Sequence, residues 1–169
     1  MNITLAELKE WLTYDPDTGV LRHARIGTVK VTGKRKVGDQ AGCVDDRGYR
    51  RMRIMRKTFL AHRLAWLWCY GELPPKGVDI DHINGDRDDN RIENLRLATR
   101  AQNNQNQKRR PSASGVKGVH IQRGGRFSSC ITPPNGNQMY LGTFDTKEAA
   151  HEAYNAAARK HFGEYARSE

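Results

Sequence analysis

Cysteine is scarce in this chain, and its three cysteines, Cys43, Cys69 and Cys130, lie far apart. None of them belongs to a C-x-x-C pair, which is the usual spacing of ligands in a structural zinc site. We therefore expect no structural zinc. An odd number of widely separated cysteines gives no disulfide scaffold either, and it favours a reducing, cytoplasmic setting.

Long apolar runs are also lacking. No stretch approaches the roughly 20 apolar residues that a membrane-spanning helix needs, so we expect no membrane partner. The opening residues, MNITLAELKE, do not have the basic-then-apolar pattern of a secretory signal. Hydrophobic residues make up 37% of the 169 residues, below the roughly 45–50% of globular domains. We therefore expect two small domains with small cores.

Positive charge is what the sequence has in excess. The net charge is +10 and the pI is about 9.8. Lys and Arg outnumber Asp and Glu by five in residues 1–106 and again by five in residues 107–169. A basic surface on both halves favours a polyanionic partner, with nucleic acid first among them. A surface that is basic only for solubility is the alternative.

Strand and turn signals alternate with helix signals along the chain. Thr4 and Glu7 form a capping box before an apolar run, which predicts a short N-terminal helix. The pattern then predicts a turn at residues 15–19, a strand at 20–22, a basic strand or loop at 29–36, a hairpin at 48–59, a helix at 61–70, a strand at 78–83, a polar loop at 84–91, a strand at 94–97 and a helix from 99 to 106.

The C-terminal third has a different pattern. Residues 107–115 mix basic residues with Pro, Ser and Gly, which is typical of a linker. Three strands are predicted beyond it, at residues 118–122, 127–132 and 139–144, with Gly- and Pro-rich turns between them. Asp145 and Glu148 are spaced to open a helix whose alanines share one face and can pack closely on a sheet.

Residues 78–106 contain the groups that hydrolysis of a phosphodiester requires. Asp81 and His82 put a carboxylate and an imidazole side by side, and Asn103 on the following helix adds an amide oxygen. Imidazole is a suitable general base near neutral pH, and Mg²⁺ prefers a few oxygen ligands. Neighbouring strand residues point to opposite faces, so this pair can serve one site only where the strand ends. A lone Asp-His pair is more often a surface feature, and His62, within an apolar helix, is expected to be structural.

The stretch IDHINGDRDDNRIENLRLATRAQNNQN, preceded by AHRLAW and GELPP, is similar to the HNH endonuclease motif of phage and homing nucleases. The resemblance covers about residues 48–106. It implies a small ββα-metal nuclease fold with His82 as general base and Asp81 and Asn103 as metal ligands. It also implies that Asn94 braces the loop that presents His82. Asn104 and Asn106 are alternatives to Asn103. The cofactor implied is one divalent metal ion, Mg²⁺ with Mn²⁺ as the alternative.

The stretches GVKGVHIQRGGRFSSCI and YLGTFDTKEAAHEAYNAAARKHFG resemble the plant ethylene-response-factor type of DNA-binding domain. The resemblance implies a three-stranded antiparallel sheet packed on one helix, with the sheet in the major groove. Most of the positions that contact bases in plant members have changed, so only the docking mode carries over. The residues expected to face DNA here are Lys117, His120, Gln122, Arg123, Arg126, Gln138 and Tyr140.

Together these patterns predict an α+β protein with four segments: an N-terminal region at residues 1–47, an HNH domain at 48–106, a linker at 107–114 and an ethylene-response-factor-like domain at 115–169. We expect a phage-encoded, homing-like endonuclease that acts on double-stranded DNA in a bacterial or phage-infected cell, as a monomer or homodimer and without a small-molecule cofactor. Arg51, Arg53 and Lys57 of the basic hairpin are expected to contact DNA as well. A DNA-binding regulator with a vestigial nuclease motif, and a structure-specific or RNA nuclease, are the alternative functions.

Overall fold

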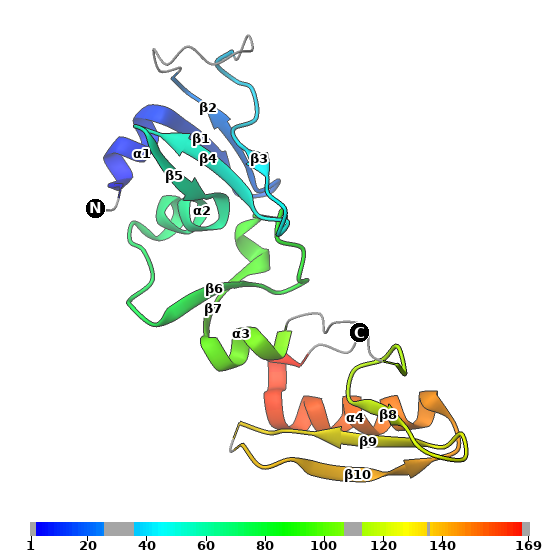
Figure 1. The fold of residues 1–169 in the computed structure, drawn as a ribbon. Helices are drawn as coiled ribbons and strands as arrows, with labels where there is room; N and C mark the ends of the chain where they lie inside the picture. Colours follow the sequence, from blue (N-terminus) through cyan, green and yellow to red (C-terminus); the bar gives the residue numbers. More distant parts are fainter. Residues whose placement is uncertain (1–2, 26–35, 107–112, 135, 167–169) are drawn as a thin grey trace. The chain divides into compact units, whose positions relative to one another are not determined.

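The computed structural model describes residues 3–25, 36–106, 113–134 and 136–166, which form a mixed α and β protein (Figure 1). This confirms the predicted α+β class. Contacts divide the chain into two compact units, Met1–Leu97 and Ala98–Glu169. Most of the basic segment predicted at residues 29–36 and of the linker predicted at 107–114 lies outside the described residues. No helix in the described ranges is both long and apolar enough to cross a bilayer.

The first unit opens with helix α1, Leu5–Trp11, which begins at the predicted capping box. The Thr4 side chain accepts a hydrogen bond from the Glu7 amide, and the Glu7 carboxylate accepts one from the Thr4 amide. Leu12 then turns to extended backbone and begins strand β1, Leu12–Asp15, which pairs antiparallel with β2, Val20–His23. Strand β1 was not predicted, because Leu12 continues the helical spacing of apolar residues.

A three-stranded sheet follows, made of β3 (Cys43–Val44), β4 (Arg50–Ile54) and β5 (Lys57–Leu60) in that order. Strands β4 and β5 are the predicted hairpin, and they turn through Met55 and Arg56, which both have positive φ. Helix α2, Ala61–Tyr70, comes directly after β5. It ends at Gly71, whose left-handed backbone (φ 78°) suits a residue without a Cβ.

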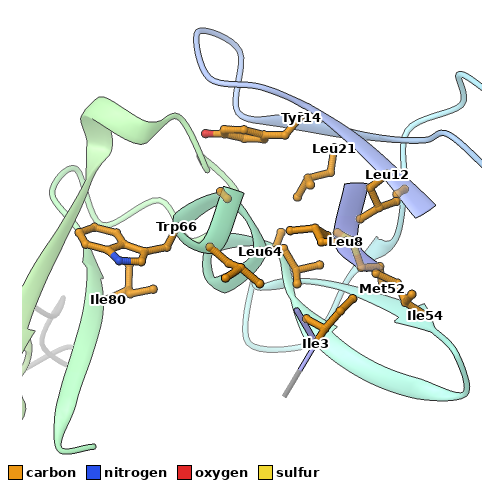
Figure 2. Close-up of a cluster of buried hydrophobic side chains, with 14 of the residues drawn as sticks. Ile3, Leu8, Leu12, Tyr14, Leu21, Met52, Ile54, Leu64, Trp66 and Ile80 are labelled. Carbon is orange, nitrogen blue, oxygen red and sulfur yellow. The ribbon is translucent and has the colours of Figure 1, made fainter. Parts of the chain in front are cut away.

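One apolar core holds the first unit together (Figure 2). Leu8, Leu21 and Leu64 bring the first helix, the first hairpin and α2 into contact and are almost fully buried. Burying a side chain of this size contributes about 1.5–3 kcal/mol. Ile80 lies near the Trp66 ring in the same core, so the strand that carries the predicted site is fixed against α2.

That strand, β6 (Val78–His82), pairs with β7 (Leu95–Thr99), and the short 3-10 helix η1 (Ile92–Asn94) lies between them in the sequence. Helix α3, Arg100–Asn106, follows β7. The predicted order of strand, loop, strand and helix is confirmed. The division into compact units falls after Leu97 and groups α3 with the second unit, and the predicted domain ranges stay a prediction.

The second unit is a three-stranded antiparallel sheet covered by one long helix. Strands β8 (Val119–Ile121), β9 (Phe127–Ile131) and β10 (Met139–Phe144) lie in the order β10-β9-β8. Helix α4, Lys147–Phe162, packs on the sheet and leads into η2, Gly163–Tyr165. Its N-cap is Thr146, which accepts from the Ala149 amide, and not the predicted Asp145. Either residue offers a side-chain oxygen, so spacing alone did not decide between them.

Candidate active site

Asp81 and His82 are the last two residues of β6, and both are buried, with 5% and 4% of their surface exposed. Ile80 before them is buried too, so three consecutive side chains are covered on both faces of the strand. The next amide, that of Ile83, donates to the Asn94 carbonyl. The pair therefore stands where the strand meets the polar loop, and its two side chains have different neighbours.

The Asp81 carboxylate pairs with Arg96 of β7. The Nε and Nη2 atoms of Arg96 both lie 2.9 Å from Asp81 Oδ2. Little of either side chain reaches solvent, 6% for Asp81 and 11% for Arg96. This buried ion pair holds the Asp81 carboxylate in a fixed orientation. Arg96 was not identified from the sequence.

The His82 ring lies against two other rings. Its centroid is 5.1 Å from that of His62 on α2, at an interplanar angle of 89°, and 6.1 Å from that of Tyr49. Tyr49 also touches His62, at 5.4 Å. His62 is buried, as expected of a structural residue, but it is buried against the predicted base. Sequence spacing gave no signal for Tyr49, which lies 33 residues before His82.

Burial lowers the pKa of the His82 imidazole, because a buried site disfavours the charged form. The Asn90 side chain, which favours the protonated ring, and the nearby carboxylates of Asp81, Asp86 and Asp89 oppose this shift. The lowered pKa keeps His82 neutral at neutral pH. A neutral imidazole has a lone pair that can accept a proton.

Asn94 ties the loop of residues 83–91 together. Its Oδ1 accepts from the Asn84 amide at 3.0 Å, and its Nδ2 donates to Asn84 Oδ1 at 3.1 Å and to the Asp89 carbonyl at 2.8 Å. These contacts join the two ends of the loop that begins after His82. They are the contacts that a loop-bracing residue needs, although the part that Asn94 plays in a reaction stays a prediction.

The same loop is fastened to the β3–β4 region by charged residues. Arg50 of β4 binds Asp88 through two hydrogen bonds, of 2.8 and 2.7 Å. Arg87 donates to the Arg47 carbonyl at 2.8 Å, and its guanidinium lies 4.8 Å from the centre of the Tyr49 ring. These partners are about 40 residues apart in the sequence, and no short motif connects them.

The predicted metal ligand Asn103 lies on α3, as do its alternatives Asn104 and Asn106. Asn103 is half-buried and Asn106 is buried. Helix α3 belongs to the second unit, whereas Asp81 and His82 belong to the first. No group of three or more His, Cys, Asp or Glu side chains suited to a metal occurs among the described residues. The predicted site uses one carboxylate and one amide, and it stays a prediction.

The predicted DNA contacts of the basic hairpin lie on two different faces of the sheet. Arg51 and Arg53 are exposed on the side of β4 opposite Met52, and Arg51 Nε lies 2.7 Å from Asp45 Oδ2. Lys57 is exposed, and it pairs in register with Ile54. Its side chain therefore lies on the face of the sheet that carries Met52 and Ile54.

In the second unit, the face of the sheet away from α4 carries part of the predicted set. His120 pairs with Ser128 and Tyr140 with Cys130, which places these side chains on one face. Tyr140 is 64% exposed and shares a hydrogen bond with Thr143. Gln122 joins this face by donating to Ser128 at 2.6 Å.

The other members of that set lie at its margins. Arg123 and Arg126 are in or beside the β8–β9 turn, and Arg126 pairs with Asp145 at 2.9 Å. Gln138 is exposed just before β10. Lys117 donates to the Gln105 carbonyl at 2.6 Å, so its ammonium group caps the end of α3. Most of the set is accessible to a large ligand, and Lys117 also has a structural contact.

Comparison with known proteins gives three similarities. Residues 59–105 match the family model described as HNH endonuclease. An uncharacterized HNH endonuclease of Acanthamoeba polyphaga mimivirus is 33% identical over 105 residues, which is 62% of this chain and 54% of the relative, so the chain spans about half the length of that relative. A solved structure concerned with DNA binding and cleavage by the HNH homing endonuclease I-HmuI is similar with a TM-score of 0.45 and 20% identity, over 96% of this chain and 91% of that one.

Proposed function

We propose that this chain, whose residues 59–105 match the HNH endonuclease family, is a metal-dependent nuclease that hydrolyses phosphodiester bonds in duplex DNA. The observation that carries the proposal is the placement of His82. It ends β6 within the matched segment, its ring is buried against two other rings, and burial lowers its pKa. A neutral, rigidly held imidazole is what a general base for water requires.

The metal ligands in this proposal are Asp81 and Asn103. Their donor chemistry fits a hard divalent cation, because both side chains offer oxygen, and the ion pair with Arg96 fixes the orientation of the Asp81 carboxylate. Mg²⁺ is the proposed ion, with Mn²⁺ as the alternative. When bound, the ion offsets negative charge on the phosphate and on the oxygen that leaves.

His82 acts in this scheme by removing a proton from the attacking water. The rings of His62 and Tyr49 limit how the imidazole can turn. Asn94 supports the step indirectly, because it fixes the loop that begins directly after His82. A positioned general base typically contributes about 10²–10⁴ in rate.

Basic residues on both units would hold the DNA, largely through phosphates. On the first unit these are Arg51, Arg53 and Lys57. On the second unit the exposed sheet face with His120, Gln122 and Tyr140 supports the ethylene-response-factor-like docking mode. A phage-encoded, homing-like role in the cytoplasm of a bacterial or infected cell, as a monomer or homodimer, is part of the same proposal.

Incubating supercoiled plasmid with the full chain and Mg²⁺ tests this function. Nicked or linear plasmid should form, and EDTA should prevent it. Plasmid that is bound but left intact would contradict the nuclease and favour the DNA-binding regulator. Competition with duplex DNA, branched DNA and RNA then identifies the preferred substrate.

A further inference from the structure

The turn between β3 and β4, residues 45–49, is held by hydrogen bonds within the turn. Asp45 Oδ1 accepts from the amides of Arg47 and Tyr49, each at 2.9 Å. The Asp45 amide donates to the Tyr49 carbonyl at 2.8 Å, and its carbonyl accepts from the Gly48 amide at 2.9 Å. The position of the Tyr49 ring is therefore set by the turn itself.

Arg87, from the loop after β6, lies on this turn. Its guanidinium is 4.8 Å from the centre of the Tyr49 ring, and Nη1 donates to the Arg47 carbonyl at 2.8 Å. Its aliphatic carbons pass over Gly48, where an added Cβ would lie 3.9 Å from Arg87 Cβ. Three contacts thus fix a side chain that otherwise has many rotamers, so less entropy is lost when it binds a ligand.

Several arginines near Arg87 have their positive charge offset by a carboxylate in an ion pair. Arg50 pairs with Asp88, Arg51 with Asp45, and Arg91 with Asp89 and Glu93. Within the part of the chain that the structure describes, Arg87 has no carboxylate partner in an ion pair. A fixed guanidinium whose charge is not neutralised is well suited to bind phosphate, because its planar fork of N–H donors matches two phosphate oxygens.

The position of Arg87 relative to His82, the proposed base, indicates which of the DNA phosphates Arg87 would bind. The Tyr49 ring, on which the Arg87 guanidinium stacks, also contacts the His82 ring, at a centroid distance of 6.1 Å. One aromatic ring therefore separates the guanidinium from the imidazole. On the basis of the proposed function, we propose that Arg87 binds a backbone phosphate close to the one that is cleaved.

The test is the salt dependence of DNA binding by the full chain. Affinity for a labelled duplex is measured in EDTA between 50 and 200 mM salt, for the wild type, Arg87→Gln, Arg87→Met and Arg87→Lys. Each lost phosphate contact lowers the magnitude of the negative slope of log K against log salt by about 0.9. Both neutral variants should show this decrease, and Met keeps the aliphatic packing over Gly48. Lys should restore the slope, since it keeps the charge.

Arg25→Gln is the matched control. Arg25 is also an arginine stacked on an aromatic ring, with its guanidinium 5.3 Å from the centre of Trp11, and its loss changes the net charge equally. Its slope should equal that of the wild type. A wild-type slope in a folded neutral Arg87 variant, or an equal decrease in Arg25→Gln, would overturn the inference.

Cleavage of the same duplex with Mg²⁺ separates this inference from the function on which it rests. If the wild type cleaves and a folded Arg87 variant has an unchanged slope, only the phosphate contact is wrong. If the wild type binds but does not cleave, the proposed function is wrong, whatever the slope of the variants.

Discussion

His62 and His82 share a buried corner of the first unit, and two imidazoles in contact cannot readily take up protons there. Burial lowers the pKa of His62 to about 3, and the neighbouring His82 and Arg63 add to the shift. In the unfolded chain the same group titrates near 6.5. Above pH 6.5 neither state is protonated, so the free energy of unfolding is at its full value. Below it, the unfolded chain binds a proton that the folded chain does not.

We therefore predict that the stability of the first unit decreases as the pH falls from 7 to 5. The limiting contribution of His62 is about 1.4 kcal/mol per pH unit. The measurement is urea unfolding across this range for the wild type and for His62→Phe, which keeps a ring but cannot titrate. The variant should show a shallower decrease, with a remainder from His82, whose pKa burial also lowers.

His120→Gln is the control, because His120 is exposed on β8. It should leave the unfolding of the first unit as it is in the wild type, because His120 is not part of that unit. Asp89, whose pKa is lowered to about 2, loses its stabilising effect only below about pH 4, outside this range. If His62→Phe were as sensitive to pH as the wild type, this explanation would be wrong.

The ion pair of Asp81 and Arg96 leads to a second prediction at the residue scale. Both side chains are almost covered, so Arg96→Gln leaves a buried carboxylate without its charged partner. The expected loss is about 3–5 kcal/mol of unfolding free energy. Glu93→Gln, which breaks the exposed Arg91–Glu93 pair, should cost less than about 1 kcal/mol. Chemical denaturation measures both. Equal small losses would show that the buried pair contributes no more than a surface pair.

At the scale of elements, the sequence predicted those helices and strands whose ends are set by neighbouring residues. The capping box predicted α1. The spacing of apolar residues, together with Gly71, predicted α2 with its observed bounds. Strand β1 was missed because Leu12 is buried equally well as the end of a helix or the start of a strand. Thr146 was missed as the N-cap because Asp145 beside it has an equivalent side-chain oxygen.

Close packing between Gly118, the residue before β8, and Tyr154 of α4 gives a prediction at the same scale. Gly118 has a φ of +76°, and an added Cβ would lie 1.9 Å from Cδ2 of the Tyr154 ring. Gly115 has a similar φ, +73°, with nothing within 4 Å. Gly118→Ala should therefore destabilise the second unit by about 1–3 kcal/mol more than Gly115→Ala does. Thermal unfolding measures both variants, and an equal effect would mean that Tyr154 can move aside without cost.

At the scale of the whole molecule, basic residues on both units should make DNA binding strongly dependent on salt. The predicted contacts include six basic residues: Arg51, Arg53, Lys57, Lys117, Arg123 and Arg126. Six phosphate contacts give a log–log slope of about −5, and a loss in affinity of about 10³ between 50 and 200 mM salt. Fluorescence anisotropy with a labelled duplex measures the slope. A slope shallower than about −2 would contradict a DNA surface on both units.

The site itself was predictable only in part. Asp81, His82 and Asn94 lie within one short segment whose residue types and spacing are specific. Arg96, Tyr49 and Arg87 were not found, because their contacts join segments 15 to 40 residues apart and depend on how the loop packs on the β3–β4 turn. Tertiary packing of this kind leaves no pattern in a single sequence.

The central claim is that His82 removes a proton from the water that attacks DNA. Its most direct test is the single-turnover cleavage rate of His82→Ala with Mg²⁺ and saturating enzyme, with the affinity for the same duplex measured in parallel. We predict a rate about 10²–10⁴ lower than that of the wild type, at unchanged affinity. Cleavage by the variant at the wild-type rate would contradict the account.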